Sequence, residues 1–160
     1  MRNERWLIMM VTGLMSLAIN ATVLTDSVKS DFMYESVDGR QLRLSSLPDD
    51  RLTVLVFFDP DCTTCRQELF QMRHSVVLQQ AVEQGRAQVL TVCTEGTREA
   101  WLKMCEEMPA WWTKGISTEE PYQVSAYDLS SLPAIYLLDN DKQVLLRVRD
   151  YAQLCELLNE

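Results

Sequence analysis

The sequence contains only one histidine, His74, among its 160 residues. A histidine-rich metal centre and a Ser/His/Asp triad are therefore both poorly supported. The sequence also lacks an excess of basic residues: it has 15 Lys and Arg and 23 Asp and Glu, which gives a net charge of −8. An acidic surface repels phosphate backbones, so we expect no nucleic-acid partner. The sequence has no internal repeat or low-complexity tract, and its 47% apolar content excludes a collagen-like or disordered chain.

A hydrophobic run long enough to span a bilayer is missing as well. The apolar stretch at the N-terminus runs from Trp6 to Ala18, which is shorter than the roughly 20 residues that a membrane helix needs. It follows a start with two arginines and precedes the small residue Ala21. This arrangement predicts a cleaved signal peptide over residues 1–21, with an uncleaved anchor as the alternative. We therefore expect export to an oxidising compartment, the bacterial periplasm, without a lipid anchor, since no cysteine lies near Ala21.

The remaining length fits one domain. We interpret residues 22–31 as a lead-in segment and residues 32–160 as the domain. A strand hairpin is expected around Asp38-Gly39, with residues 111–124 irregular. Further strands are expected at 52–58, 87–93, 134–138 and 143–148, and helices at 63–85, 97–108 and 151–158. Apolar strands that alternate with helices indicate an α/β layered fold.

Two cysteines, Cys62 and Cys65, lie where a buried strand gives way to a helix. The first turn of a helix has unpaired backbone amides, and these and the helix dipole favour an anion. A cysteine at that position has its thiolate stabilised, and the thiolate is the reactive form. We therefore identify Cys62 as the candidate nucleophile. Cys65, one turn later, is the candidate thiol that resolves a mixed disulfide.

Three other interpretations of the cysteine pair stay open. A structural disulfide would close a very short loop and stabilise little. Half of a zinc site would need a second ligand pair, and the other cysteines are scattered singly. Copper(I) binding is chemically possible, because thiolates suit that ion. We expect neither a metal nor an organic cofactor, since disulfide exchange moves electrons between sulfurs.

Several motifs together resemble the thioredoxin superfamily, and more closely its exported TlpA/ResA-type members. The motifs are Asp38-Gly39-Arg40, Phe57-Phe58, Cys62-x-x-Cys65-Arg66-x-Glu68 and Ser131-Leu132-Pro133-Ala134. The resemblance covers residues 32–158. It implies a thioredoxin-like α/β fold, in which a central mixed β-sheet is flanked by helices and preceded by a β-hairpin.

The resemblance also implies roles for individual residues. Pro133 matches the family's cis-proline, which faces the cysteine pair, and Leu132 before it would pair with the substrate backbone. Glu68 matches a glutamate that tunes the acidity of the cysteines. Thr63 and Thr64, between the cysteines, are further expected substrate contacts.

Three departures from the family pattern concern the redox direction and the proton path. The Thr-Thr dipeptide is that of neither typical reductants nor typical oxidants. Phe70 stands where the family often has a proline, so we expect the helix to lack the usual kink. The buried strand aspartate expected near Val56 is also missing, so a proton on Cys65 must leave through Glu68 or water. Asp59 and Asp61 disfavour a thiolate nearby, whereas a strong oxidant depends on a stabilised thiolate.

We therefore expect an exported thiol–disulfide oxidoreductase, more a reductant or isomerase than an oxidant. Its expected partners are proteins with thiols or disulfides and, by resemblance, a membrane thiol-electron carrier, with the protein itself a monomer. A non-catalytic thioredoxin-like scaffold and a copper(I) chaperone are the alternatives. Cys93, Cys105 and Cys155 fit small buried hydrophobes, with a Cys93–Cys105 disulfide as the alternative.

Overall fold

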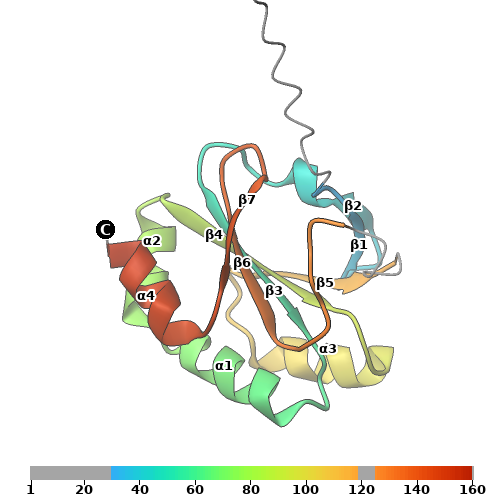
Figure 1. Ribbon diagram of the computed structural model, residues 1–160. Helices are drawn as coiled ribbons and strands as arrows, with labels where there is room; N and C mark the ends of the chain where they lie inside the picture. The colour runs from blue at the N-terminus through green and yellow to red at the C-terminus, as the bar shows by residue number, and fades with distance from the viewer. Residues whose placement is uncertain (1–29, 119–124, 160) are drawn as a thin grey trace, which may run out of the picture.

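Seven strands form one mixed sheet in the part of the chain that the computed structural model describes, residues 30–118 and 125–159. Their order across the sheet is β2-β1-β5-β4-β3-β6-β7 (Figure 1). Strands β3, β4 and β5 are parallel, and the other neighbouring pairs are antiparallel. The strands are β1 (Met33–Ser36), β2 (Gln41–Arg43), β3 (Leu52–Phe58), β4 (Ala87–Cys93), β5 (Thr113–Ser117), β6 (Ala134–Leu138) and β7 (Val144–Val148).

Strand β3 is the apolar run of the sequence, and it is a central strand that is buried on both faces of the sheet. It lies between β4 and β6, and its residues are buried from Thr53 onward. Val54, Val56 and Phe58 pack on one face of the sheet, whereas Leu55 and Phe57 pack on the other. Side chains alternate along a strand, so a strand covered on both sides needs apolar residues at every position.

All four α-helices contribute buried side chains to the same core, on the Val56 face of the sheet. They are α1 (Thr63–Arg73), α2 (Val76–Glu83), α3 (Arg98–Glu107) and α4 (Tyr151–Asn159). Figure 1 shows α1, α2 and α4 grouped on one side of the strands. Consecutive right-handed crossovers from β3 to β4 and from β4 to β5 place α1 and α3 on the same face.

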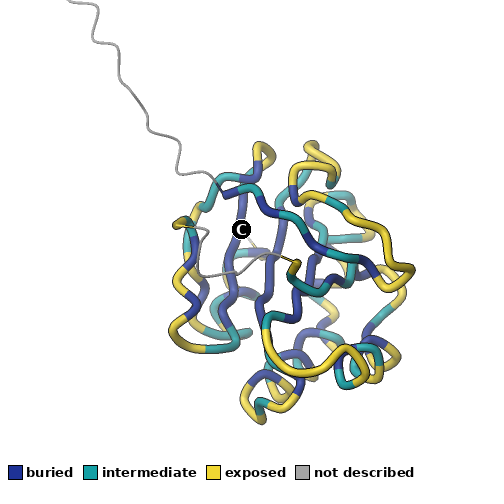
Figure 2. Tube along the Cα trace, turned by 90° about the vertical axis from the view of Figure 1, so that its right-hand side faces the viewer, coloured by how far each residue is buried: buried dark blue, intermediate teal, exposed yellow. Residues whose placement is uncertain are grey.

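The opposite face of the sheet has a second core, to which the N-terminal strands and the segment that leads into β6 contribute. Phe32, Tyr34 and Leu44 pack there with Tyr127 and Leu129. Phe32, Phe57, Tyr127 and Tyr136 form a chain of tilted and edge-on ring contacts with centroids 5.0 to 6.3 Å apart. Strands β3, β4 and β6 are buried along almost their whole length, and many of the exposed positions in Figure 2 lie in turns and on helix surfaces.

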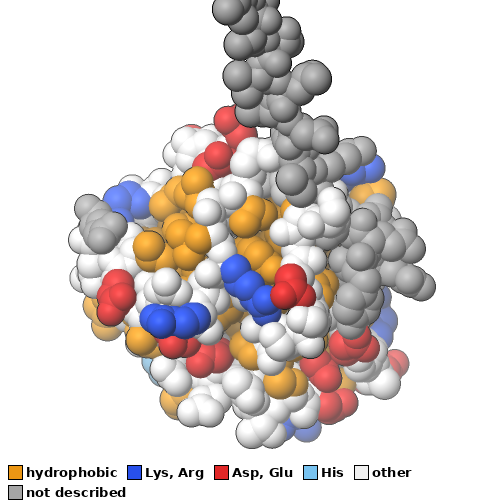
Figure 3. Space-filling view, viewed as in Figure 1, with side chains coloured by type: hydrophobic (Ala, Val, Ile, Leu, Met, Phe, Trp, Pro, Cys, Tyr) orange, Lys and Arg blue, Asp and Glu red, His pale blue; other side chains and the backbone are white. Residues whose placement is uncertain are grey.

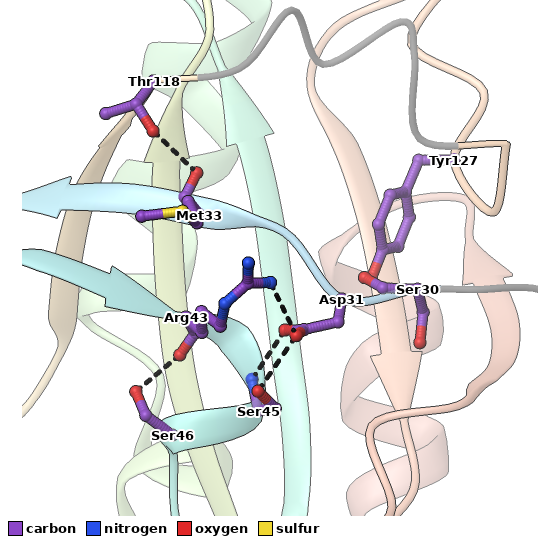
Figure 4. Close-up of polar contacts among 8 residues, drawn as sticks. All are labelled: Ser30, Asp31, Met33, Arg43, Ser45, Ser46, Thr118 and Tyr127. Atoms are coloured by element: carbon purple, nitrogen blue, oxygen red, sulfur yellow. Dashed lines mark hydrogen bonds and ion pairs between the residues drawn. The ribbon is translucent and has the colours of Figure 1, made fainter.

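Contacts at Ser30 and Asp31, at the end of the expected lead-in segment, connect the start of the described chain to this second face (Figure 4). The carboxylate of Asp31 accepts hydrogen bonds from the backbone N–H and the hydroxyl of Ser45, at 2.9 and 3.0 Å. It also pairs with Arg43 at 3.1 Å. The hydroxyl of Tyr127 donates to the carbonyl of Ser30 at 2.8 Å. The β1–β2 hairpin and the segment before β6 are therefore held together through these two residues.

The predicted helix over 63–85 is wrong as a single element, because the chain breaks between α1 and α2. Ser75 has an extended backbone conformation, and its side chain accepts a hydrogen bond from the N–H of Leu78 at 3.1 Å. A serine oxygen that binds the amide two or three residues later begins a new helix. Gly85 follows α2 with a positive φ of 69°, as expected of a glycine that ends a helix.

The prediction of irregular structure from 111 to 124 is wrong at residues 113–117. This segment is β5, which is parallel to β4 and antiparallel to β1. Residues 119–124 lie outside the described part of the chain. The β1–β2 hairpin, the strands at 52–58, 87–93 and 134–138, and the last helix are confirmed, and the remaining predicted boundaries differ by one residue.

The expected signal peptide lies outside the described residues. Among the residues that are described, no helix has the length and apolar character required to cross a membrane.

Candidate redox site

The candidate site begins where β3 ends, at a short acidic turn. The carboxylate of Asp59 accepts a hydrogen bond from the backbone N–H of Asp61 at 2.8 Å. The carbonyl of Asp59 accepts one from the N–H of Cys62 at 3.2 Å. Arg66 donates from Nε to the carbonyl of Pro60 at 2.8 Å. These contacts fix the turn and place Cys62 immediately before α1.

Cys62 is the N-cap residue of α1, and its sulfur caps the helix. The backbone N–H of Cys65 donates to Sγ of Cys62 at 3.2 Å. The side chain of Cys62 is partly exposed, and Thr63 and Thr64 after it are exposed. Sulfur at this position lies beside the unpaired amides and the positive end of the helix dipole. The structure therefore places Cys62 where an accessible nucleophile is expected.

Cys65 has the opposite environment, although it lies only three residues later. It is fully buried, among the side chains of the helix-side core. Burial, together with the nearby sulfur of Cys62 and the charge of Asp59, raises the pKa of Cys65 to about 12 from an ordinary 9.0. At neutral pH Cys65 is therefore a protonated thiol held beneath Cys62.

The segment before β6 reaches the cysteine pair from the other end of the sequence. Leu132 and Pro133 are joined by a cis peptide bond, as the resemblance implied. The sulfur of Cys62 lies 3.8 Å from the carbonyl oxygen of Leu132. Pairing of β3 with β6 brings the two segments together, because Phe57 lies opposite Ala134. Both Leu132 and Pro133 are only partly buried, so their backbone borders the accessible sulfur.

Glu68 makes a contact that sequence reasoning did not anticipate. Its carboxylate accepts a hydrogen bond from the backbone N–H of Tyr151 at 2.9 Å, at the first residue of α4. A carboxylate at a helix N-terminus satisfies an unpaired amide and complements the helix dipole. Glu68 thus joins α1 to the start of α4, and its expected influence on the acidity of the cysteines stays a prediction.

The remaining cysteines are thiols in this structure. Cys93 and Cys105 are buried in the helix-side core, as expected of small hydrophobes, and the alternative disulfide between them is not formed. Burial raises the pKa of Cys93 to about 12 and that of Cys105 to about 11. Cys155 is only partly buried, and its sulfur lies 3.9 Å from the hydroxyl of Ser75.

His74 and the tryptophan pair Trp111-Trp112 are not part of the site. His74 is exposed at the end of α1, where its Nδ1 lies 2.8 Å from the carbonyl of Phe70. Trp112 is buried, and Trp111 is partly exposed beside it. Within residues 30–118 and 125–159, no three His, Cys, Asp or Glu side chains are placed so that they could hold a metal ion.

A sequence model of the AhpC/TSA family matches residues 25–147, which is most of the chain. The chain belongs to the AhpC/TSA family. The matched range of this AhpC/TSA chain includes both cysteines of the pair and the cis Leu132–Pro133 bond. No protein of curated function matches the sequence.

Solved structures share the thioredoxin-like fold of this AhpC/TSA chain. A conserved protein of unknown function from Bacteroides fragilis is 33% identical with a TM-score of 0.71, over 80% of this chain and 93% of its own. The C-terminal domain of an uncharacterized protein from the same organism is 26% identical with a TM-score of 0.73, over 81% and 93%. The thioredoxin domain of a thiol-disulfide oxidoreductase from Bacteroides vulgatus is 18% identical with a TM-score of 0.67, over 83% and 94%.

Proposed function

We propose that this protein reduces or rearranges disulfides in other proteins, with Cys62 as the attacking thiol and Cys65 as the resolving thiol. The observation that supports this most is the difference between the two sulfurs. One is partly exposed at a helix N-terminus and 3.8 Å from the carbonyl of Leu132. The other is buried one turn deeper, and its pKa is raised to about 12.

The proposed reaction is a pair of exchanges between sulfurs. The thiolate of Cys62 attacks one sulfur of a client disulfide, the client S–S bond breaks, and the departing client thiolate takes a proton from water. Cys65 then gives its proton to water and attacks the sulfur of Cys62. The bond between Cys62 and the client breaks, the second client thiolate takes a proton from water, and a Cys62–Cys65 disulfide remains. Two electrons pass from the cysteine pair to the client. A dithiol donor must return them, and we propose a membrane thiol carrier for this step.

Client binding is proposed at the segment before β6. Pro133 has no backbone N–H, and the carbonyl of Leu132 already faces Cys62. A client chain in extended conformation next to Leu132 would therefore present its cysteine to Cys62, with Thr63 and Thr64 on the exposed side of the same sulfur.

Two carboxylates support the reducing direction. Asp59 and Asp61 are adjacent to the cysteine motif, and negative charge disfavours the thiolate form of the reduced pair. A disulfide oxidant derives its strength from a stabilised reduced form. We propose that this acidic turn shifts the pair toward reduction or isomerisation, in an exported protein of the periplasm.

Reduction of insulin by dithiothreitol, followed by turbidity, tests the function directly. The full chain should accelerate the reaction, and Cys62→Ser should abolish the acceleration. Cys155→Ser is the matched control, because it also removes a partly buried thiol, and it should retain the rate. A wild-type protein that gives no acceleration with any dithiol donor would instead support the non-catalytic scaffold.

A further inference from the structure

We propose that the groove between α1 and α3 docks a client segment that carries an acidic and an apolar side chain close to the cysteine that Cys62 attacks. This inference rests on the proposed function and adds the chemistry of the client to it. The groove is a cavity of about 460 Å³, within the size range of sites that bind small ligands or side chains. It is lined by Asp61, Arg66, Leu69, Phe70, Arg73, Ala100, Lys103, Met104, Glu107 and Met108.

The groove begins at the residue before the attacking cysteine. Asp61 immediately precedes Cys62, and Arg66 binds the carbonyl of Pro60 in the same turn. The groove then follows α1 as far as Arg73, and neither Leu132 nor Pro133 lines it. A client would therefore contact this surface in addition to the backbone of the segment before β6.

The charge of the groove is opposite to that of the whole molecule. The chain has a net charge of −8, yet the groove has three basic side chains and two acidic ones. Arg73 and Glu107 are paired with each other at 2.8 Å. Lys103 is exposed and forms no ion pair with the described residues. With Asp61 also in the lining, Arg66 and Lys103 leave one net positive charge in the groove, which a carboxylate of the client would complement.

The apolar part of the groove includes an aromatic side chain, Phe70, that is exposed to water in the absence of a client. Phe70 is 54% exposed, and the guanidinium of Arg73 lies 4.9 Å from the centre of its ring. Leu69 and Met104 continue the apolar surface toward α3. Aromatic and arginine side chains are the residues that contribute most to binding at protein interfaces. No local sequence pattern indicates this surface, because its residues come from two helices, α1 and α3, that are separated in the chain by α2 and β4.

The distance between Phe70 and Cys62 limits where the client's side chains must lie. An α-helix rises about 1.5 Å per residue, so Phe70 is on the order of 12 Å along α1 from Cys62. An extended chain covers this distance in about four residues. The acidic and apolar side chains are therefore expected within about four residues of the client's cysteine.

Reduction of two synthetic peptide disulfides, with dithiothreitol as the dithiol donor, tests the inference. One peptide has Glu three residues and Phe four residues from its cysteine on both sides, and the other has Lys in place of each Glu. The wild type should have the higher kcat/KM for the Glu peptide. Lys103→Glu should lower the ratio of kcat/KM for the Glu peptide to that for the Lys peptide about threefold, since an exposed charge pair contributes modestly to binding. Phe70→Ala should lower kcat/KM for both peptides and leave hydroxyethyl disulfide, a small neutral substrate, unchanged.

The control variant is Arg40→Glu, which makes the same change in net charge at the exposed turn between β1 and β2. It should keep the preference of the wild type. Equal kcat/KM for the two peptides in the wild type, or equal effects of Lys103→Glu and Arg40→Glu, would overturn the docking groove while leaving the redox function in place. Failure to reduce hydroxyethyl disulfide as well would overturn the proposed function and this inference with it.

Discussion

At the scale of single residues, the site depends on how differently two cysteines of one short motif are surrounded. Cys62 caps α1 and is partly exposed, whereas Cys65 is buried and its pKa is raised to about 12, mainly by burial. The proposed order of attack and resolution rests on this difference, because a client would meet the accessible sulfur before the buried one. Spacing alone could indicate the pair, and burial supports the proposed roles.

Replacement of Asp59 tests the electrostatic part of this arrangement. Burial is the main cause of the raised pKa of Cys65, and the charges of Cys62 and Asp59 add to it. Asp59→Asn removes one charge and retains an oxygen that can bind the N–H of Asp61, so we expect the pKa of Cys65 to fall. The ¹³Cβ shift of Cys65 in reduced protein, followed against pH, measures this. Asp61→Asn is the control, and an equal fall in that variant would contradict a specific effect of Asp59.

The residues that sequence analysis identified at the site were those with local signals. Cys62 and Cys65 stand out by spacing, and Pro133 by resemblance to a known motif. The contact between Glu68 and Tyr151, at 2.9 Å, joins residues 83 positions apart. Such a contact depends on how α1 and α4 pack, which no local pattern encodes.

At the scale of helices and strands, buried elements were predictable and partly exposed ones were not. Strand β3 has an apolar side chain at almost every position, which is typical of a strand covered on both faces. Strand β5 has the sequence Thr-Lys-Gly-Ile-Ser, with little apolar content and a glycine at its centre. Its place in the sheet comes from pairing with β4 and β1, so tertiary context overrides weak local preference.

Gly115 in β5 gives a test of this packing. A Cβ atom at this position would lie 2.5 Å from Cδ2 of Tyr34, whose side chain is fully buried. Gly115→Ala should therefore destabilise the protein by about 1–3 kcal/mol, the usual cost of overpacking a core. Urea denaturation measures the change. Gly39→Asn is the control, because an added Cβ there meets nothing within 4 Å and asparagine tolerates a positive φ; a similar loss in both variants would contradict the steric explanation.

At the scale of the whole molecule, the acidic character of the chain does not extend evenly over its surface. On the face of the molecule that Figure 3 shows, the basic side chains form isolated groups among acidic and hydrophobic ones, without a continuous basic band. A continuous band is the usual footprint of a nucleic-acid-binding protein. The absence of a nucleic-acid partner stays a prediction, and the α1–α3 groove is the surface where local charge departs from the overall balance.

The helix-side core contains buried thiols, so the free energy of unfolding should fall as the pH rises into the alkaline range. Burial, with a contribution from Asp59, raises the pKa of Cys93 to about 12 from an ordinary 9.0. The unfolded thiol loses its proton first, so the stability from this group is complete below about pH 9 and is lost as pH rises through 12.

Cys93→Ala should therefore reduce the slope of unfolding free energy against pH between 9 and 12, by about 1.4 kcal/mol per pH unit. Urea titrations of reduced protein across this range give the slope. Thr91→Val, a buried substitution on the same strand without an ionisable group, is the control. An unchanged slope in Cys93→Ala would show that Cys93 ionises equally in the folded and unfolded states.

The central claim is that Cys62 attacks a client disulfide and Cys65 resolves the product. Reduced Cys65→Ser and Cys62→Ser variants, each mixed with a peptide disulfide and analysed by intact-mass spectrometry, test it most directly. Cys65→Ser should accumulate one covalently attached peptide, mapped to Cys62, and Cys62→Ser should accumulate little. Equal attachment in both variants, or attachment to Cys65 in the Cys62→Ser protein at the same rate, would contradict the account.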